Sequence, residues 1–522
     1  MSNEPVDSFS SKVSINVLTN IVRTVIMALV GFMMVPYYLN EFGMATYAII
    51  PLITTITTYF LAMSDSLANA FTRYTAIAIH NGDSDLMNRT FSTSVIGMFR
   101  CIMALMPLVL AISISAPYIF STGDASALSV QLAFFMVIMS TLMISFGACM
   151  SSVFMAYNKM YVTYLARIVH CILQVGLVVT FFLVEGASLT LIGVSYILAS
   201  TAFLLIMGFH LKRVCPSLKL SRQYYDSQLL KKIGRLGTWA IVAEFGSLMF
   251  IQASMVVVNL MLGSELQGSF SIAANVISMV NTACTSIAAA SAPLVYRCYS
   301  HGDSEGMVHV LKVFTKFSGI LMAFPIAFIM IFMEQIIFIW IGPGNEAICP
   351  LLRTMLPIEV AVCAVSSLIE VPIVCEKIKP VATTTILLGV LNIVIAILLI
   401  EFTDMGLMSA CISWVVTMGL LKVIVYPYYS SKLTSNKGTR YYPSIIFSII
   451  AFAIVMILGT LATEVFTLPA TWTAVIMTFT PAFLIYFVLV VRFMFTKNER
   501  SMVMTFLPGF VQKFMNGHIH HE

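Results

Sequence analysis

Residues 71–89, FTRYTAIAIHNGDSDLMNR, recur about 220 positions later as residues 295–312, VYRCYSHGDSEGMVHVLK. Both copies place an arginine, Arg73 or Arg297, at the end of an apolar run. Each then has a Gly-Asp-Ser string, an acidic residue and, two positions further, a methionine. The turns that precede the two runs also match, LNEFGMATYAI from Leu39 and LGSELQGSFSI from Leu262. Two matches at nearly the same offset indicate an internal repeat.

The rest of the chain is mostly apolar. Of its 522 residues, 59% are hydrophobic and 10% are charged, whereas a soluble domain has about 25% charged residues. So few charges cannot cover a water-facing surface, and lipid is therefore the expected outer solvent. Fourteen apolar runs are long enough to cross a bilayer, approximately 15–38, 44–66, 91–117, 129–155, 161–184, 190–211, 237–262, 266–296, 312–341, 348–375, 380–401, 405–429, 443–466 and 472–496. The sequence predicts an all-α polytopic membrane protein with fourteen transmembrane helices.

Basic residues predict the orientation of these spans. With both termini in the cytoplasm, most of the 28 Lys and Arg residues lie on the inner side, and the short outer loops carry acidic residues instead. The net charge of +5 is thus explained by orientation, and no nucleic-acid partner is expected.

Six spans separate the two copies of the repeat, so both copies have the same orientation and an axis along the membrane normal relates them. We expect an N-terminal lobe over 1–211, a basic cytoplasmic linker over 212–236 and a C-terminal lobe over 237–429. Two further helices over 443–496 and a cytoplasmic tail over 497–522 complete the chain.

Polar residues at helical spacing predict a face turned toward protein or water. The span 266–296 carries such a stripe, formed by Ser271, Asn275, Ser278 and Thr282. Its repeat mate, 44–66, carries Thr54 and Thr58. We expect both stripes to line a substrate cavity, with Ser/Thr packing between helices as the alternative.

The first span carries Asn16, Asn20 and Arg23 on one face, and its repeat mate carries Glu244. Arg23 is expected to bind an anionic substrate and to be neutralised by Glu244 when substrate is absent. A permanent ion pair that joins the lobes is the alternative. Two arginines at the inner mouth complete the expected binding set, with solvated topological charges as the alternative: Arg73 and Arg297.

Carboxylates within spans are candidate carriers of H+ or Na+. Glu359 and Glu370 share one face of the span 348–375, below Arg353, and Glu244 is the third candidate. The alternative is an Arg–Glu pair within the bundle. Lys422 is expected to extend to the inner membrane surface.

Sequence motifs give no indication of catalysis, a metal site or a cofactor. GxxxxGK[ST], HExxH and CxxC do not occur, so the chain is not expected to be an enzyme. Most of the cysteines, including Cys284 and Cys363, fall inside apolar runs and are interpreted as small core residues. The C-terminal histidines are attributed to a polar tail: His518, His520 and His521.

Residues 35–49, VPYYLNEFGMATYAI, and 68–94, ANAFTRYTAIAIHNGDSDLMNRTFSTS, resemble the N-terminal signature of Wzx-type polysaccharide flippases. These belong to the multidrug/oligosaccharidyl-lipid/polysaccharide (MOP) exporter superfamily. Asn40 stands where the family's turn has glycine. The resemblance implies a MATE-like fold of two six-helix lobes plus two C-terminal helices, with Arg23 as the cavity cation and Arg73 at the second helix exit.

The function that the resemblance implies is the flipping of a polyprenyl-diphosphate-linked oligosaccharide to the outer leaflet of a prokaryotic plasma membrane by alternating access. The two C-terminal helices would help form a lateral groove for the lipid tail. Expected partners are this substrate, membrane lipids, and glycosyltransferases or a polymerase of the same pathway. A multidrug or toxin cation antiporter of the same superfamily is the first alternative. A membrane glycosyltransferase or ligase is the second, disfavoured by the small outer loops.

Overall fold

A computed structural model describes residues 6–80, 83–435, 437–465, 468–496 and 498–500. The three C-terminal histidines and most of the predicted tail lie outside the described residues. Within them the chain is helical, and thirteen helical segments are long and apolar enough to cross a membrane. The second predicted span is also one helix, although its apolar part, Ile49–Ala62, is shorter. The predicted all-α polytopic fold is therefore confirmed.

Contacts between helices divide the chain into two compact units, Met1–Ser271 and Ile272–Glu522. This division lies within a helix, and the boundary predicted between lobes at the linker 212–236 stays a prediction. Helix α7 (Ser227–Leu262) falls in the first unit because it packs on α2 (Ile49–His80). The Thr55 hydroxyl of α2 donates a hydrogen bond to Gln252 Oε1 of α7 at 2.9 Å.

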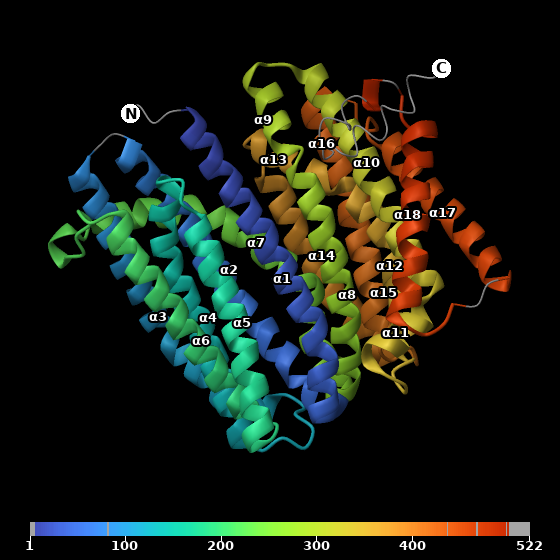
Figure 1. The fold of residues 1–522 in the computed structure, drawn as a ribbon, viewed down its shortest axis with the longest axis horizontal. Coiled ribbons are helices and arrows are strands. Elements are labelled where there is room, and N and C mark those ends of the chain that lie inside the picture. Colours follow the sequence, from blue (N-terminus) through green and yellow to red (C-terminus); the bar gives the residue numbers. More distant parts are fainter. Residues whose placement is uncertain (1–5, 81–82, 436, 466–467, 497, 501–522) are drawn as a thin grey trace. The chain divides into compact units, whose positions relative to one another are not determined.

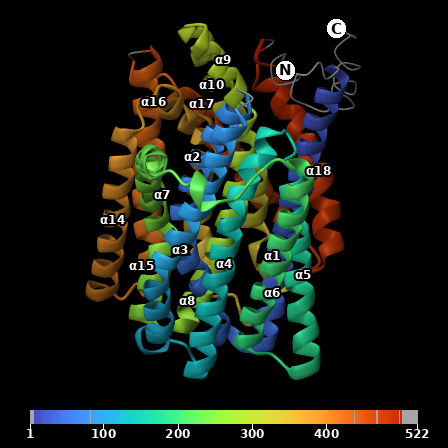
Figure 2. The ribbon, with the colours of Figure 1, turned by 90° about the vertical axis from the view of Figure 1, so that its left-hand side faces the viewer.

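Apart from the first part of α7, which crosses the others and is seen end-on in Figure 2, the helices of the first unit run alongside one another (Figures 1 and 2). Besides α2 and α7 they are α1 (Val6–Tyr47), α3 (Ser84–Ile119), α4 (Ala127–Ala156), α5 (Tyr161–Glu185) and α6 (Leu189–Val214), with a short 3-10 turn, η1 (Arg222–Tyr224). At the centre, α4 packs on α2 and α6. A Cβ atom on Gly147 of α4 would lie 2.5 Å from the ring of Phe203 in α6, so glycine permits this close approach.

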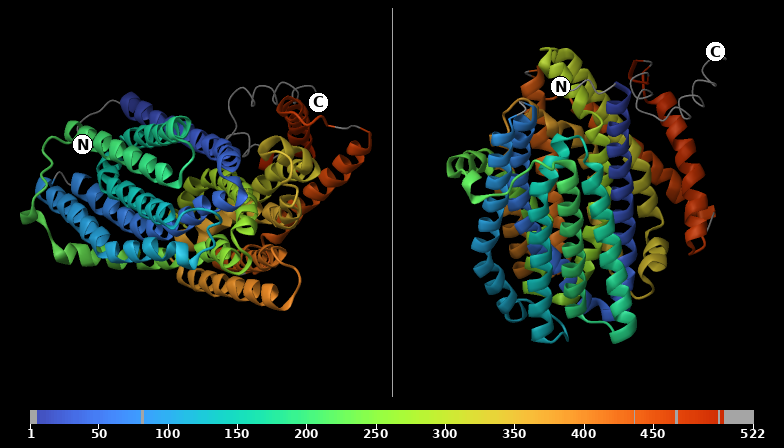
Figure 3. Two further views of the ribbon diagram at one scale, coloured as in Figure 1. Left: turned by 90° about the horizontal axis from the view of Figure 1, so that it is seen from below. Right: turned by 60° about the vertical axis from the view of Figure 1, so that its left-hand side comes forward.

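The second unit contains the rest of α8 and the helices that follow it. The elements are α8 (Ser264–Ala289), α9 (Ala292–Ser300), α10 (Ser304–Ile331), α11 (Met333–Ile341), α12 (Ile348–Val365), η2 (Ser366–Ile369), α13 (Glu370–Val374), α14 (Lys379–Phe402), α15 (Met408–Gly419), the π-helix η3 (Leu420–Val425), α16 (Tyr426–Ser435), α17 (Tyr442–Val465) and α18 (Trp472–Phe493). Helix α10 packs on both α12 and α17. Both views in Figure 3 show α17 and α18, in red, at the edge of this unit.

The structure explains both parts of the sequence repeat. Asp83 caps the N-terminus of α3 by accepting a hydrogen bond from Leu86 N, and Asp303 caps α10 in the same way through Gly306 N. In the preceding turns, Gly43 has a φ of 71° and Gly263 has a φ of 90°. Side chains disfavour this backbone region, so each repeated string holds the residue type that its turn or cap needs.

Candidate functional site

Arg23 lies in α1 and is half-buried against α5. Its Nε and Nη2 atoms both donate to Asn20 Oδ1, at 3.2 and 2.9 Å. Its guanidinium also lies 5.3 Å from the centre of the Tyr164 ring. These partners are an amide and an aromatic ring, both neutral, so they orient the guanidinium without cancelling its charge.

The expected pairing of Arg23 with Glu244 is not what the helix packing produces. Helix α1 packs on α5, whereas α7, which carries Glu244, packs on α2 and α3. The Glu244 side chain is exposed. The repeat relates the two positions, but the helices that carry them pack on different neighbours.

Asn16 is engaged in holding α1 to the turn before α5. Its Nδ2 donates to the backbone oxygen and to Oδ1 of Asn158, at 3.1 and 2.8 Å. Its Oδ1 accepts from Tyr161 N at 2.8 Å. Asn158 has a φ of 54°, a left-handed conformation that asparagine tolerates better than most residues. These bonds occupy the amide of Asn16 on both sides, which indicates a structural role for this predicted binding residue.

We therefore expect Asn16→Ala to destabilise the protein by about 1–3 kcal/mol, because it leaves polar groups of the α4–α5 turn without partners. The measurement is the free energy of unfolding in detergent. Thr19→Ala is the control, since the Thr19 hydroxyl bonds only to its own helix backbone. Equal stability of Asn16→Ala and Thr19→Ala would contradict the structural role.

The polar stripe of α8 has a graded environment. Ser271 is buried and donates to Gly268 O at 2.7 Å. Asn275 is half-buried, whereas Ser278 and Thr282 are exposed. The Thr282 hydroxyl donates to Ser278 O at 2.8 Å, so it is satisfied by its own helix. The stripe stays a candidate cavity lining.

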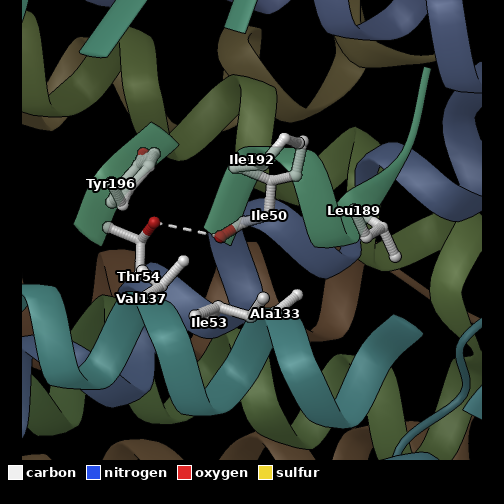
Figure 4. Close-up of a pocket in the computed structure, with 8 residues that line it drawn as sticks. All are labelled: Ile50, Ile53, Thr54, Ala133, Val137, Leu189, Ile192 and Tyr196. Carbon is white, nitrogen blue, oxygen red and sulfur yellow. Dashed lines mark hydrogen bonds between the residues drawn. The ribbon is translucent and has the colours of Figure 1, made fainter. Parts of the chain in front are cut away.

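Thr54, from the equivalent stripe of α2, lines a hollow of about 240 Å³ within the first unit (Figure 4). Its hydroxyl donates to Ile50 O at 3.0 Å. The other lining residues, apart from Tyr196, are aliphatic: Ile50, Ile53, Ala133, Val137, Leu189 and Ile192. This hollow is too apolar to hold a diphosphate or a sugar.

In the second unit, the carboxylate of Glu359 is fully buried in α12. Asn281 Nδ2 of α8 donates to its Oε1 at 3.1 Å, while its Oε2 has no hydrogen-bond partner among the described residues. Lys422 of η3 interacts electrostatically with this carboxylate. A buried carboxylate with a free oxygen and a nearby lysine is chemically suited to bind or release a cation or a proton.

Two members of this group, Asn281 and Lys422, are not among the site residues that the sequence predicts. Asn281 lies off the polar stripe of α8, and Lys422 was expected to extend to the membrane surface. Instead Lys422 is half-buried, with Nζ 4.7 Å from the centre of the Tyr426 ring. It lies in a π-helical segment, and such segments often occur at functional sites. A single sequence gives no reliable signal for a π-helix.

The interpretation of Cys284 and Cys363 as separate core residues is wrong. They form a disulfide that joins α8 to α12, with Cα atoms 5.1 Å apart. Each follows a member of the Asn281–Glu359 pair by about one helical turn, so the hydrogen bond and the disulfide belong to the same helix contact. The other eight cysteines are free. No spacing motif could identify this pair, because its members lie 79 residues apart.

The remaining candidates have other partners or environments. Arg353 Nη2 pairs with Glu334 Oε1 of α11 at 2.9 Å, and more than half of each side chain is exposed. Glu370 is half-buried at the start of α13, and Arg297 is exposed in the last turn of α9. Arg73 lies in α2, but its side chain is outside the described part of the structure. Among the described residues there is no group of three His, Cys, Asp or Glu placed to hold a metal ion.

The chain is thus a multi-pass helical membrane protein with the fold of MATE transporters of the MOP superfamily. An inward-facing multidrug resistance MATE transporter has a TM-score of 0.64 and 13% identity, and covers 85% of this chain and 96% of its own. An outward-facing structure of a multidrug resistance MATE transporter has a TM-score of 0.55 at 13% identity, covering 87% and 96%.

Two further comparisons concern individual proteins. The chain is 23% identical to the uncharacterized membrane protein EpsK of Bacillus subtilis over 433 residues, which span 82% of this chain and 84% of that protein. A MOP transporter from Pyrococcus furiosus, described as having a binding pocket of reverse polarity, has a TM-score of 0.55 and 14% identity, covering 88% and 95%. No family model matches the chain.

Proposed function

We propose that this protein is a transporter that flips a polyprenyl-diphosphate-linked oligosaccharide from the inner to the outer leaflet of a prokaryotic plasma membrane by alternating access. The observation that carries this proposal is Arg23, a half-buried guanidinium in a membrane helix whose partners, Asn20 and Tyr164, are neutral. A charged side chain within a membrane helix costs free energy, and such residues usually mark a functional site. A guanidinium pairs well with the oxygens of a diphosphate.

A groove between α10 and α18 supports the lipid part of this substrate. Its empty volume, open solvent included, is about 200 Å³, and it is lined by Phe317, Ile320, Leu321, Tyr486, Phe487, Val490, Val491 and Phe495. The one hydroxyl among these side chains, that of Tyr486, donates to Ile320 O at 2.6 Å, so the groove offers a prenyl chain an apolar wall. Lys316 directly precedes the lining residue Phe317 on α10. Its Nζ lies 4.9 Å from the centre of the Phe495 ring and pairs with Glu499 Oε2 at 3.0 Å.

Coupling to H+ or Na+ is part of the same proposal, with Glu359 as the coupling residue. Its burial, its unpartnered Oε2 and the proximity of Lys422 support this role. Glu244 and Glu370 have less support because their side chains are more exposed.

A multidrug cation antiporter is the second candidate. The buried carboxylate of Glu359 favours it, as do the multidrug resistance transporters that share the fold. Against it stands Arg23, because a guanidinium repels cationic drugs. The MOP transporter with a pocket of reverse polarity is a precedent for other pocket charges on this fold. A glycosyltransferase or ligase finds no support in the structural neighbours, which are transporters.

Purified protein in liposomes distinguishes the two transport functions. We expect the protein to move a fluorescent polyprenyl-diphosphate sugar to the opposite leaflet, where a reagent confined to that side of the membrane can react with it. The rate of this reaction should exceed that in liposomes without protein. A soluble sugar diphosphate should compete, whereas a lipophilic cation should not. Cation uptake without lipid flipping would refute the flippase and favour the antiporter.

A further inference from the structure

The linker after α6 is held against α3 by hydrogen bonds. Its segment 215–226, here called the strap, bonds to three polar side chains of that helix, those of Asn88, Ser92 and Thr93. Lys219 N donates to Asn88 Oδ1 at 2.8 Å, and the Ser92 hydroxyl donates to Lys219 O at 3.1 Å. Asp226 N donates to Thr93 Oγ1 at 3.0 Å. Backbone groups of the strap are therefore satisfied by side chains of α3, which restricts its conformation.

Charged contacts hold the far end of the strap. The guanidinium of Arg100 lies 4.4 Å from the centre of the Tyr225 ring, and Arg89 Nη2 pairs with Asp226 Oδ2 at 2.8 Å. Hydrogen bonds from Leu229 N and Gln228 N, with the Arg89 pair, hold the pKa of Asp226 below its usual range. Asp226 thus stays ionised and is occupied as the N-cap of α7.

The strap and the helix ends beside it present an array of exposed positive charges. The exposed basic side chains are Lys212, Arg213, Lys219, Arg222 and Lys231. Asp226 is the one acidic residue between positions 212 and 235, and its carboxylate pairs with Arg89 and caps α7. Two apolar side chains are exposed among them, Leu220 at 58% and Phe209 at 55%. The guanidinium of Arg213 lies 4.2 Å from the centre of the Phe209 ring.

We infer that the strap is a binding surface for the headgroups of anionic phospholipids. Lys212 and Arg213 lie in the last turn of α6, the candidate membrane-spanning segment Leu189–Val214, and we place them at the phosphate groups of the lipid. Lys219 and Arg222 follow on the strap, with Leu220 between them to enter the acyl boundary. Clusters of basic residues next to a membrane helix attract anionic lipid. Because α3 already orders the strap, lipid binding loses little conformational entropy.

The test is lipid selection by the purified full-length protein. The wild type is exchanged into mixed micelles of phosphatidylglycerol and phosphatidylcholine, and the lipid that it retains is quantified by mass spectrometry. We expect phosphatidylglycerol to be enriched, and the enrichment to fall as salt is added. The variant K212Q/R213Q/K219Q/R222Q should lower the enrichment by at least about tenfold, since each of the four charges near an anionic surface contributes several-fold.

Two matched variants separate this surface from general charge. K377Q/K379Q/K432Q/K437Q removes the same charge from other positions on the predicted cytoplasmic side and should leave most of the enrichment. K212R/R213K/K219R/R222K keeps every charge of the strap and should behave as the wild type, even if the neutral variant fails to fold. The inference is overturned by salt-independent enrichment in the wild type, by an equal loss in both neutral variants, or by a loss in the charge-preserving variant.

Discussion

Arg23→Ala is expected to lower the rate of lipid-linked oligosaccharide flipping by about a hundredfold while leaving the amount of folded protein in the membrane unchanged. A hydrogen bond to a charged group is worth about 1.5–3 kcal/mol. Losing two such bonds to the diphosphate costs at least about 3 kcal/mol. Because about 1.4 kcal/mol corresponds to a factor of ten, the rate should fall about a hundredfold. Folding should be largely unaffected, since the described partners of Arg23 are the neutral Asn20 amide and the Tyr164 ring. The measurement is the initial flipping rate in liposomes at matched protein content.

Arg353→Ala is the matched control for this experiment. It also removes a guanidinium from a membrane helix, but from an exposed pair with Glu334. Exposed ion pairs contribute little, so this variant should flip lipid at nearly the wild-type rate. Arg23→Lys keeps the charge but loses the two-pronged geometry, and its rate should fall between those of the wild type and Arg23→Ala. A wild-type rate in Arg23→Ala would remove Arg23 from the mechanism.

Glu359→Gln is expected to destabilise the protein and to abolish the response of transport to an ion gradient. The substitution preserves a hydrogen-bond acceptor for Asn281 but leaves the nearby ammonium of Lys422 without its opposing charge. Removing one partner of a buried pair costs about 3–5 kcal/mol. Because Lys422 is half-buried and forms no direct ion pair with Glu359 in the described part of the structure, we expect the lower part of that range. Unfolding in detergent measures the first effect, and flipping with and without a pH or sodium gradient measures the second.

The double variant Glu359→Gln/Lys422→Met separates the structural role from the coupling role. Removing both charges should restore most of the stability, since neither charge is then left uncompensated. Coupling should not return, because the carboxylate is still absent. Glu370→Gln serves as the control from the same region and should keep both properties. Ion-driven transport that survives in the double variant would rule out Glu359 as the coupling residue.

The membrane fold was determined by the sequence itself. Apolar runs of sufficient length leave the backbone no choice but helix within lipid, because each N–H and C=O group must be satisfied inside its own segment. The repeat likewise marked equivalent turns and caps, since the conformation at Gly43 and Gly263 and the capping by Asp83 and Asp303 depend on local residue types. Turns and caps of this kind can be predicted from the sequence alone.

The partners of the charged residues were decided only by the tertiary structure. The repeat suggested that Arg23 faces Glu244, but α1 packs on α5 and α7 packs on α2 and α3. Glu359 accepts a hydrogen bond from Asn281 and interacts electrostatically with Lys422, and both partners come from helices distant in the sequence. Lys422 itself lies in a π-helical turn. Spacing along one chain reveals which face of a helix is polar, but not which other helix that face meets. The physical reason is that helix packing follows the fit of side chains over the whole bundle.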